Sequence, residues 1–141
     1  MAEQASEMAG QPVPKSGEFV WTEIASNDAD KCKAFYNAVF GWKFQESDAT
    51  QPEMQSIEFS SGSENPVGGL YQINSEWFGE NPPPPHFMSY VAVDNVDENA
   101  RLATESGATI IRGPMDIPNV GRICIFQDPT GAMIATYRQQ D

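Results

Sequence analysis

The 141-residue sequence contains few cysteines and no long apolar run. Its two cysteines, Cys32 and Cys124, lie outside any CxxC motif, so the sequence predicts neither a disulfide framework nor a cysteine-rich metal site. We interpret both as small core hydrophobes. No stretch is long enough to span a membrane, and residues 1–17 lack the basic start and apolar core of a signal peptide. These absences favour a cytoplasmic protein.

Basic residues are also scarce. The chain carries 20 acidic residues against 8 basic ones, for a formal net charge of -12 at pH 7. A field of this sign repels phosphate backbones and anionic lipid headgroups, so we expect neither nucleic-acid binding nor membrane binding. Histidine occurs once, at His86, and this is the one side chain that titrates near neutral pH without help from its surroundings.

One pattern occurs twice in the chain, about 66 residues apart. Each copy reads as a strand, a polar helix cap, an amphipathic helix, a glycine stop and further strands. Two copies at this spacing indicate an internal duplication, because a solenoid needs at least about three repeats. We therefore predict a disordered leader over 1–17 and one domain over 18–140, with module one at 18–73, a linker at 74–85 and module two at 86–140.

The first module begins with a strand over 18–25, in which Trp21 and Glu23 share one face. Asn27 or Asp28 is a candidate N-cap for the helix that follows, and Gly41 is its predicted stop. Within this helix an apolar stripe recurs at three- and four-residue spacing, formed by Cys32, Phe35, Tyr36, Val39 and Phe40. Further strands are predicted over 42–45, 54–60 and 67–73.

The linker ends in the four prolines of 82–85, which predict an extended polyproline II spacer. In the second module we expect a strand over 86–93, a helix capped by Asp94 and ended by Gly107, and a strand over 109–112. Residues 113–121 read as a loop. A hairpin over 122–127 and 132–138 is expected to turn at Asp128-Pro129-Thr130-Gly131. The predicted helix carries an apolar set made of Val96, Ala100, Leu102 and Ala103.

These elements predict an α+β fold: two βαβββ modules forming an open eight-stranded mixed barrel around one cavity. Each module would carry its helix on the outside of the sheet. The concave inner face would then be the natural place for a ligand.

The arrangement resembles the vicinal oxygen chelate superfamily, which includes glyoxalase I, extradiol dioxygenases, fosfomycin-resistance transferases and bleomycin-binding proteins. The resemblance covers residues 17–140. Its carriers include Trp21-Thr22-Glu23-Ile24, Phe40-Gly41-Trp42, Val67-Gly68-Gly69, Tyr90 to Asp97, and Asp128-Pro129-Thr130-Gly131-Ala132. Their order and spacing are specific for the fold and not for a reaction. The resemblance implies a homodimer that binds one small molecule in each open barrel.

Metal-dependent members of this superfamily hold a divalent ion with His and Glu or Gln side chains. The resemblance places the equivalent positions at Trp21, Gly69, Met88 and Ala135, which pair between the modules at offsets of 67 and 66 residues. None of the four is a good ligand for such an ion, so we expect no metal and no other cofactor. The remaining alternative is an off-centre ion held by Glu23, His86, Glu58 or Tyr137.

Glu23 and His86 are the two candidate catalytic residues. If Glu23 faces inward, burial would raise the pKa of its carboxyl group and suit it to proton transfer. The alternative is a glutamate that is partly exposed, or one that is paired with Arg122 or Arg138. His86 could act as a general base or contact a ligand. Alternatively, it is a rim histidine at the start of a strand.

The candidate ligand-binding residues alternate along strands that should face the barrel interior: Trp21, Met88, Tyr90, Met133 and Tyr137. Such side chains suit an aromatic or amphipathic molecule, and the alternative is that they form the barrel core. Arg122 could meet an anionic group on the ligand, or it could be structural. Trp77 and Phe78, in the linker, are expected to cover the cavity or pack at a dimer interface.

Three functional hypotheses follow. The first is a metal-independent protein that binds an apolar or aromatic small molecule, with Glu23 and His86 orienting it. The second is a lyase-type or isomerase-type enzyme in which Glu23 or His86 transfers a proton, with or without an off-centre metal. The third is a subunit whose cavity is filled and whose role is interaction.

Overall fold

The first module contains one helix and four strands in the part of the chain that the structure describes. The computed structural model describes residues 14–46, 56–61, 66–74, 79–118 and 120–139. Strand β1 (Phe19–Ser26) leads into helix α2 (Ala29–Phe40), and three strands follow: β2 (Lys43–Glu46), β3 (Ser56–Ser60) and β4 (Gly68–Gln72). Asp28, one of the two predicted caps, accepts the Lys31 N–H at 3.1 Å. Gly41 ends the helix with a φ of 73°, as predicted.

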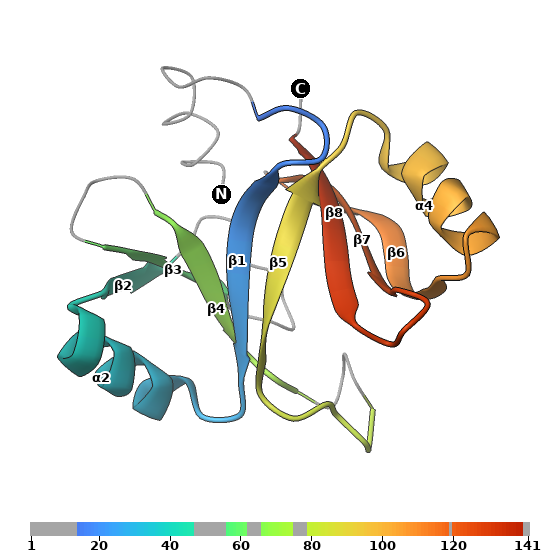
Figure 1. Cartoon of the computed structure of the whole chain (residues 1–141). Helices are drawn as coiled ribbons and strands as arrows, with labels where there is room; N and C mark the ends of the chain where they lie inside the picture. The colour runs from blue at the N-terminus through green and yellow to red at the C-terminus, as the bar shows by residue number, and fades with distance from the viewer. Residues whose placement is uncertain (1–13, 47–55, 62–65, 75–78, 119, 140–141) are drawn as a thin grey trace.

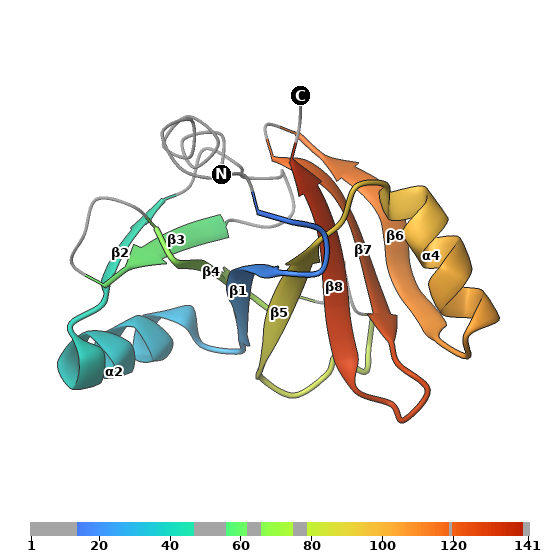
Figure 2. The same ribbon diagram turned by 45° about the horizontal axis from the view of Figure 1, so that its top comes forward.

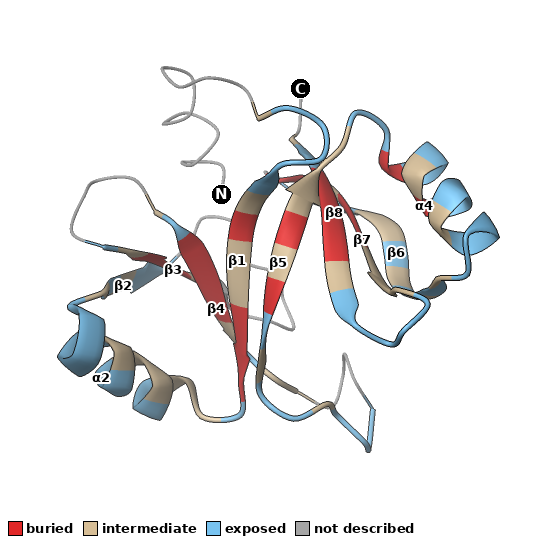
Figure 3. Ribbon diagram, viewed as in Figure 1, coloured by how far each residue is buried: buried red, intermediate tan, exposed pale blue. Residues whose placement is uncertain are grey.

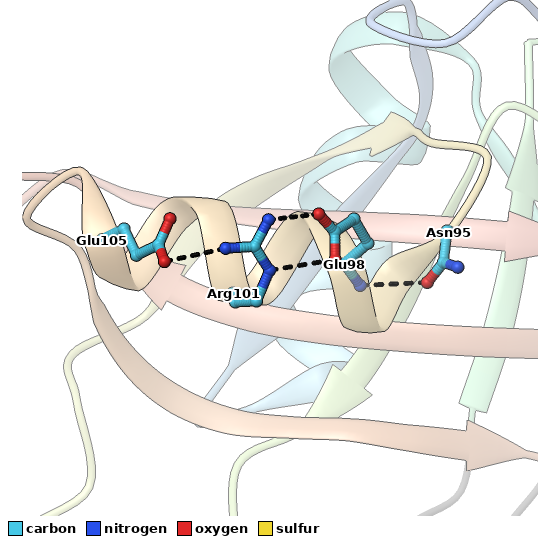
Figure 4. A network of polar contacts seen from close by, with 4 residues as sticks. All are labelled: Asn95, Glu98, Arg101 and Glu105. Atoms are coloured by element: carbon cyan, nitrogen blue, oxygen red, sulfur yellow. Dashed lines mark hydrogen bonds and ion pairs between the residues drawn. The ribbon is translucent and has the colours of Figure 1, made fainter.

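The second module repeats this order. Strand β5 (His86–Ala92) precedes helix α4 (Val96–Glu105), which is followed by β6 (Thr109–Ile117), β7 (Gly121–Gln127) and β8 (Met133–Gln139). Figure 4 shows how α4 is held: the Asn95 side chain accepts the Glu98 N–H at 2.9 Å, and Arg101 bonds to Glu98 and Glu105 on the adjacent turns. These contacts cap the first turn and pair charges along the exposed side of the helix.

The eight strands among the described residues belong to one mixed sheet in the order β2-β3-β4-β1-β5-β8-β7-β6 (Figure 1). The first strands of the two modules, β1 and β5, pair antiparallel at its centre. The sheet curls away on both sides of these strands without closing (Figure 2). This confirms the α+β class and the two βαβββ modules around an open curled sheet. Neither described helix is long and apolar enough to cross a membrane.

The helices pack on the outer face of the sheet. Cys32 and Tyr36 of α2 lie against a buried cluster of Ile24, Phe59 and Leu70. Val96 and Ala100 of α4 are buried together with Cys124. The inner face carries a separate cluster built around Trp21, Met88, Tyr90, Ile123 and Tyr137. Figure 3 shows that buried residues concentrate in the central strands, whereas α2 has none.

The predicted apolar stripe of α2 is only partly packed. Phe35, Val39 and Phe40 are 57%, 53% and 58% exposed, although Cys32 and Tyr36 of the same stripe face the sheet. The rings of Phe35 and Phe40 lie beside Tyr36, at centroid distances of 5.0 and 6.0 Å. The periodicity correctly predicted a helix, but it overestimated how much of the helix the sheet covers.

The predicted loop over 113–121 is wrong, because β6 continues through Gly113 and Pro114 to Ile117. The pairing with β7 shifts register between Arg112 and Met115, so the glycine and proline fall in an irregular part of the ladder. Proline is tolerated there since β6 is an edge strand, in which an N–H can be missing without breaking a second ladder.

The predicted cap at Asp94 is also wrong. Asn95, in extended backbone geometry with φ -148° and ψ 106°, occupies the cap of α4. The Asp94 carbonyl instead accepts a hydrogen bond from Arg138 at 2.9 Å. Leu102, predicted as part of the apolar set of α4, is 48% exposed. The hairpin turn is as predicted, with the Asp128 carboxylate accepting the Thr130 N–H at 2.8 Å.

Some predictions fall outside the described residues. The leader over 1–13 and the linker aromatics Trp77 and Phe78 belong to this group. The four prolines at 82–85 lie outside helix and strand, immediately before β5. Gly17, at the end of the predicted leader, donates its N–H to the Ala92 carbonyl at 2.8 Å and is therefore tied to the sheet.

Candidate functional site

The inner face of the sheet carries a row of side chains that crosses both modules. Glu23 on β1 is in register with Gly69 on β4 and with Met88 on β5. Gly69 is in turn opposite Glu58 on β3. Because directly opposed residues point to the same side of a sheet, Glu58, Glu23 and Met88 share the inner face, with a gap at the glycine.

Two further rows flank this one. On one side Ala25 lies between Tyr71 and His86, and on the other Tyr90 lies between Trp21 and Ala135. The structure therefore brings together five of the predicted site residues on one face: Trp21, Glu23, His86, Met88 and Tyr90. Met133 and Tyr137 lie on the same face of β8, two residues to either side of Ala135.

One end of the inner face is packed. Trp21, Met88, Tyr90 and Tyr137 are each less than a tenth exposed and belong to one apolar cluster. The Tyr137 hydroxyl donates to the Val120 carbonyl at 3.2 Å, which satisfies the phenol within the protein. These four side chains therefore pack as part of the core, which is the alternative given for them in the sequence analysis.

The other end of the inner face is more open. Glu23, Tyr71 and His86 are half-buried, and Met133 is 37% exposed. This end lies where β1 and β4 finish and where β5 and β8 begin. Glu23 thus stands at the boundary between a packed apolar floor and a part of the face that solvent reaches.

The Glu23 carboxyl group is held in one place by its neighbours. The Trp21 indole N–H donates to Oε2 of Glu23 at 2.7 Å. A Cβ atom at position 69 would lie 3.2 Å from the same oxygen and 3.3 Å from the indole nitrogen. The absence of a side chain at Gly69 therefore leaves the space in which the carboxyl group and the indole meet.

Burial and charge alter the protonation of Glu23. Burial raises the pKa of its carboxyl group to about 7, and the negative charge of Glu58 adds to this effect, whereas the hydrogen bond from Trp21 opposes it. Burial, followed by the charge of Glu23, also raises the pKa of the Tyr71 and Tyr90 hydroxyls. Both phenols therefore remain protonated at neutral pH and can donate hydrogen bonds.

The alternative that Glu23 pairs with an arginine is wrong for the described residues, because Trp21 is its hydrogen-bond partner. Arg138 bonds to the Asp94 carbonyl, and Arg122 lies on the outer face. The Arg122 guanidinium makes two bonds to Asp97, at 2.8 and 2.9 Å, and one to Asp116 at 3.1 Å. These carboxylates raise the pKa of Arg122 and tie α4 to β6. Arg122 thus does not join the inner-face residues, and its structural interpretation fits.

His86 lies at the open end, diagonal to Glu23 across the β1–β5 pair. Its ring Nδ1 lies 2.8 Å from the Pro84 carbonyl oxygen, which can only accept, so Nδ1 is the donor in this contact. The contact with Pro84 therefore holds the orientation of the imidazole ring. This geometry suits a residue that orients a ligand at the rim.

The four positions at which the resemblance places metal ligands do not fit a divalent ion. Trp21, Met88 and Ala135 are buried in or beside the apolar cluster, and Gly69 supplies no side chain. Among the described residues no group of three or more His, Cys, Asp and Glu side chains lies close enough together to hold a metal. The donor set that borderline divalent cations require is therefore missing from this part of the protein.

Two inner-face residues were missed or undervalued by sequence reasoning. Tyr71 was not selected, although its position two residues after Gly69 puts it on the same strand face. Glu58 was considered only as a substitute metal ligand, yet it is 2% exposed and one strand beyond the gap at Gly69. The two-residue alternation along a strand indicates which residues of that strand share a face. Only the pairing between strands shows that Tyr71 and Glu58 lie on the same face as Glu23.

Comparison with known sequences gives a consistent family. The sequence pattern of the Glyoxalase/Bleomycin resistance protein/Dioxygenase superfamily matches residues 18–136. CFP32 of Mycobacterium tuberculosis, whose name assigns it provisionally as a glyoxylase, is 30% identical over 130 residues, covering 89% of this chain and 46% of that protein. The anthracycline biosynthesis protein DnrV of Streptomyces peucetius is 25% identical, covering 87% and 47%. The chain spans about half the length of these curated relatives.

Solved structures share the fold. A methylmalonyl-CoA epimerase from Mycobacterium tuberculosis superposes with a TM-score of 0.60 at 15% identity, covering 94% of this chain and 96% of that one. The Streptomyces coelicolor methylmalonyl-CoA epimerase gives a TM-score of 0.63 at 17% identity, covering 90% and 100%. At these identities the likeness concerns the fold alone.

Proposed function

Because this chain belongs to the Glyoxalase/Bleomycin resistance protein/Dioxygenase superfamily, we propose that it binds an apolar or aromatic small molecule on the inner face of its sheet, without a metal. The observation that carries this proposal is the position of Glu23. Its half-buried carboxyl group stands where the packed apolar cluster meets the open end of the face. Sites for small molecules typically combine an apolar lining with a few fixed polar groups.

The ligand would lie over the open end. Met133, which is 37% exposed, would contact its apolar part above the packed Met88, and methionine adapts well to ligands of differing shape. Glu23 would accept hydrogen bonds, and Tyr71 and His86 would orient the polar part at the rim. Trp21 would act indirectly, by holding the Glu23 carboxyl group over Gly69.

A screen of small aromatic and apolar compounds by thermal shift, followed by calorimetry, tests this proposal. We expect Met133→Ala to weaken binding of any hit about 3- to 10-fold, in line with the loss of a few buried methylene groups. Leu102→Ala, which removes a similarly exposed apolar side chain from the outer side of α4, is the matched control and should leave binding unchanged. Equal effects of the two variants would contradict an inner-face site.

Whether binding depends on a metal ion is tested separately, by removing metal from the protein. Treatment with a chelator, followed by dialysis, should leave the affinity of the hit and the melting temperature unchanged. If one equivalent of a divalent ion copurifies, and its removal abolishes binding, the metal-independent proposal is wrong and an off-centre metal site becomes the better explanation.

A second candidate function is an enzyme of the lyase or isomerase type in which Glu23 transfers a proton. The pKa of about 7 favours it, since a general base works best when its pKa lies near the operating pH. If a substrate is found, Glu23→Gln should lower kcat by at least about 100-fold while retaining binding. Unchanged turnover in this variant would remove Glu23 from the chemistry.

We also propose that the chain forms a homodimer. The exposed side chains of Phe35, Val39 and Phe40 on α2 support this, together with Phe87, which is 51% exposed and lies 6.0 Å from the Tyr36 ring. Contiguous apolar surface of this kind is typical of interaction sites. Light scattering should give a dimer mass for the native chain and a monomer mass for Phe35→Ser. A monomer at all concentrations would refute the proposal.

A further inference from the structure

The inner face is polar on one side of the central strands and apolar on the other. On the module-one side, Glu23 and Glu58 flank the gap at Gly69, and the Tyr71 phenol lies in the adjoining row. On the module-two side, Met88 faces Glu23 directly and continues into the cluster of Tyr90, Ile123 and Tyr137. A ligand that lies across β1 and β5 therefore meets carboxyl groups at one end and apolar side chains at the other.

The carboxyl groups of Glu23 and Glu58 lie near enough for the charge of one to affect the other. They lie two strands apart, about 10 Å between backbones, and Gly69 contributes no side chain between them. The Glu23 carboxyl group leans over the glycine, within 3.2 Å of where its Cβ would be. The charge of Glu58 opposes ionisation of Glu23, whereas a positive charge or a strong donor placed beside Glu23 would favour the ionised carboxylate and be stabilised by it.

One hydrogen-bonding position of Glu23 is already used. The Trp21 indole donates to Oε2, and the indole cannot accept a bond in return. The groups that face Glu23 from the neighbouring strands are Glu58, Tyr71, Tyr90 and, diagonally, His86. None of these four is a permanent cation.

We infer that the preferred ligand is an amphipathic amine: an aromatic or apolar group bearing a cationic nitrogen that donates to Glu23, with its apolar part over Met88 and Met133. This inference rests on the proposed function, since it names the chemical class of ligand for the same face. It also assigns a direction, in which the nitrogen points toward module one and the ring toward module two. An anionic ligand of the same size would place its charge against two carboxyl groups.

Three probes of matched shape test the inference: 2-phenylethylamine, 2-phenylethanol and 3-phenylpropionate, which are cationic, neutral and anionic at pH 8. Calorimetry on the full chain should give an affinity for the amine about tenfold above that for the alcohol, because a charge-assisted hydrogen bond is stronger than a neutral one. The carboxylate should bind most weakly. Amine affinity should also rise between pH 6 and pH 8, as Glu23 ionises.

Glu23→Gln keeps the shape and the acceptor for Trp21 but removes the charge. In this variant the amine and the alcohol should bind within about twofold of each other. Glu98→Gln, which removes the same charge from the exposed side of α4, is the control and should retain the tenfold preference. A preference that survives in Glu23→Gln overturns the inference, and so does tighter binding of the carboxylate.

The outcomes separate this inference from the proposed function. If all three probes bind equally and Met133→Ala weakens each of them, the inner face is a ligand site but the preference for an amine is wrong. If none of the probes binds, the inference is overturned, and the proposed function then depends on the wider compound screen.

Discussion

Replacing Glu23 by glutamine should make the protein more stable at pH 8 and leave its stability nearly unchanged at pH 4. In the folded chain the pKa of this carboxyl group rises from 4.5 to about 7, mainly because burial disfavours the charged form. Glutamine has nearly the same shape, and its carbonyl oxygen can still accept the Trp21 indole N–H. The variant therefore removes the ionisation and little else.

The sign and size follow from proton linkage. Between pH 4.5 and pH 7 the folded state binds more protons at Glu23 than the unfolded state, so the free energy of unfolding falls as the pH rises through this window. At about 1.4 kcal/mol for each pKa unit, the full difference is roughly 3 kcal/mol. The Glu23→Gln variant has no carboxyl group to ionise at this position, so its free energy of unfolding does not fall in this way. For a domain of this size the difference corresponds to a melting temperature about 10 °C higher at pH 8.

Urea denaturation of the native chain and the variant at half-unit pH steps from 4 to 8 measures this directly. The difference between the two proteins cancels the contributions of all other titrating groups. Glu98→Gln provides a control of opposite sign, since Arg101 lowers the pKa of Glu98 and its removal should cost stability as the pH rises. A difference for Glu23→Gln that stays constant with pH would refute the argument, because Glu23 would then be as well solvated as an exposed glutamate.

Three further outcomes are expected. Gly69→Ala should cost about 1–2 kcal/mol and shift the Trp21 indole proton in NMR spectra, because the new Cβ would crowd the Glu23 carboxyl group; an unchanged indole resonance would show that the crowding is relieved elsewhere. Arg122→Gln should lower the melting temperature and return the pKa of Asp97 toward its usual value without altering ligand affinity, and a large loss of affinity would restore Arg122 to the site. Asp28→Ala should lower the free energy of unfolding by about 1 kcal/mol in urea titrations, through loss of the α2 cap, whereas Asp30→Ala on the same turn should cost less.

Local signals in the sequence predicted much of the fold. The cap at Asp28, the stop at Gly41 and the turn at 128–131 each depend on a few neighbouring residues, so they could be recognised without knowing the rest of the structure. The alternation along β1 and β5 likewise put Trp21, Glu23, Met88 and Tyr90 on one face. These features need only the two-residue period of a strand and the chemistry of caps and turns.

The cap at Asp94 and the loop over 113–121 were local errors, whereas the errors about the site concern contacts between distant parts of the chain. Arg122 lies on the outer face because its neighbours Ile123 and Cys124 divide between the two faces, and its partner Asp97 lies 25 residues away. The importance of Gly69 could not be seen from strand alternation either. Its effect depends on which side chain from β1 leans into the space it leaves, and this is decided by packing.

The seam between β1 and β5 also has a consequence for how the chain folds. Within each module the hairpin strands pair with near neighbours in the chain, and the longest pairing joins residues 46 positions apart, Glu23 and Gly69, whereas the seam joins residues about 65 positions apart, such as Glu23 and Met88. Closing the longer loop costs more entropy, so the two halves should gain structure before they dock. Since the inner-face residues come from both sides of the seam, the site would be completed in the last step of folding, and a bound molecule would slow the separation of the halves.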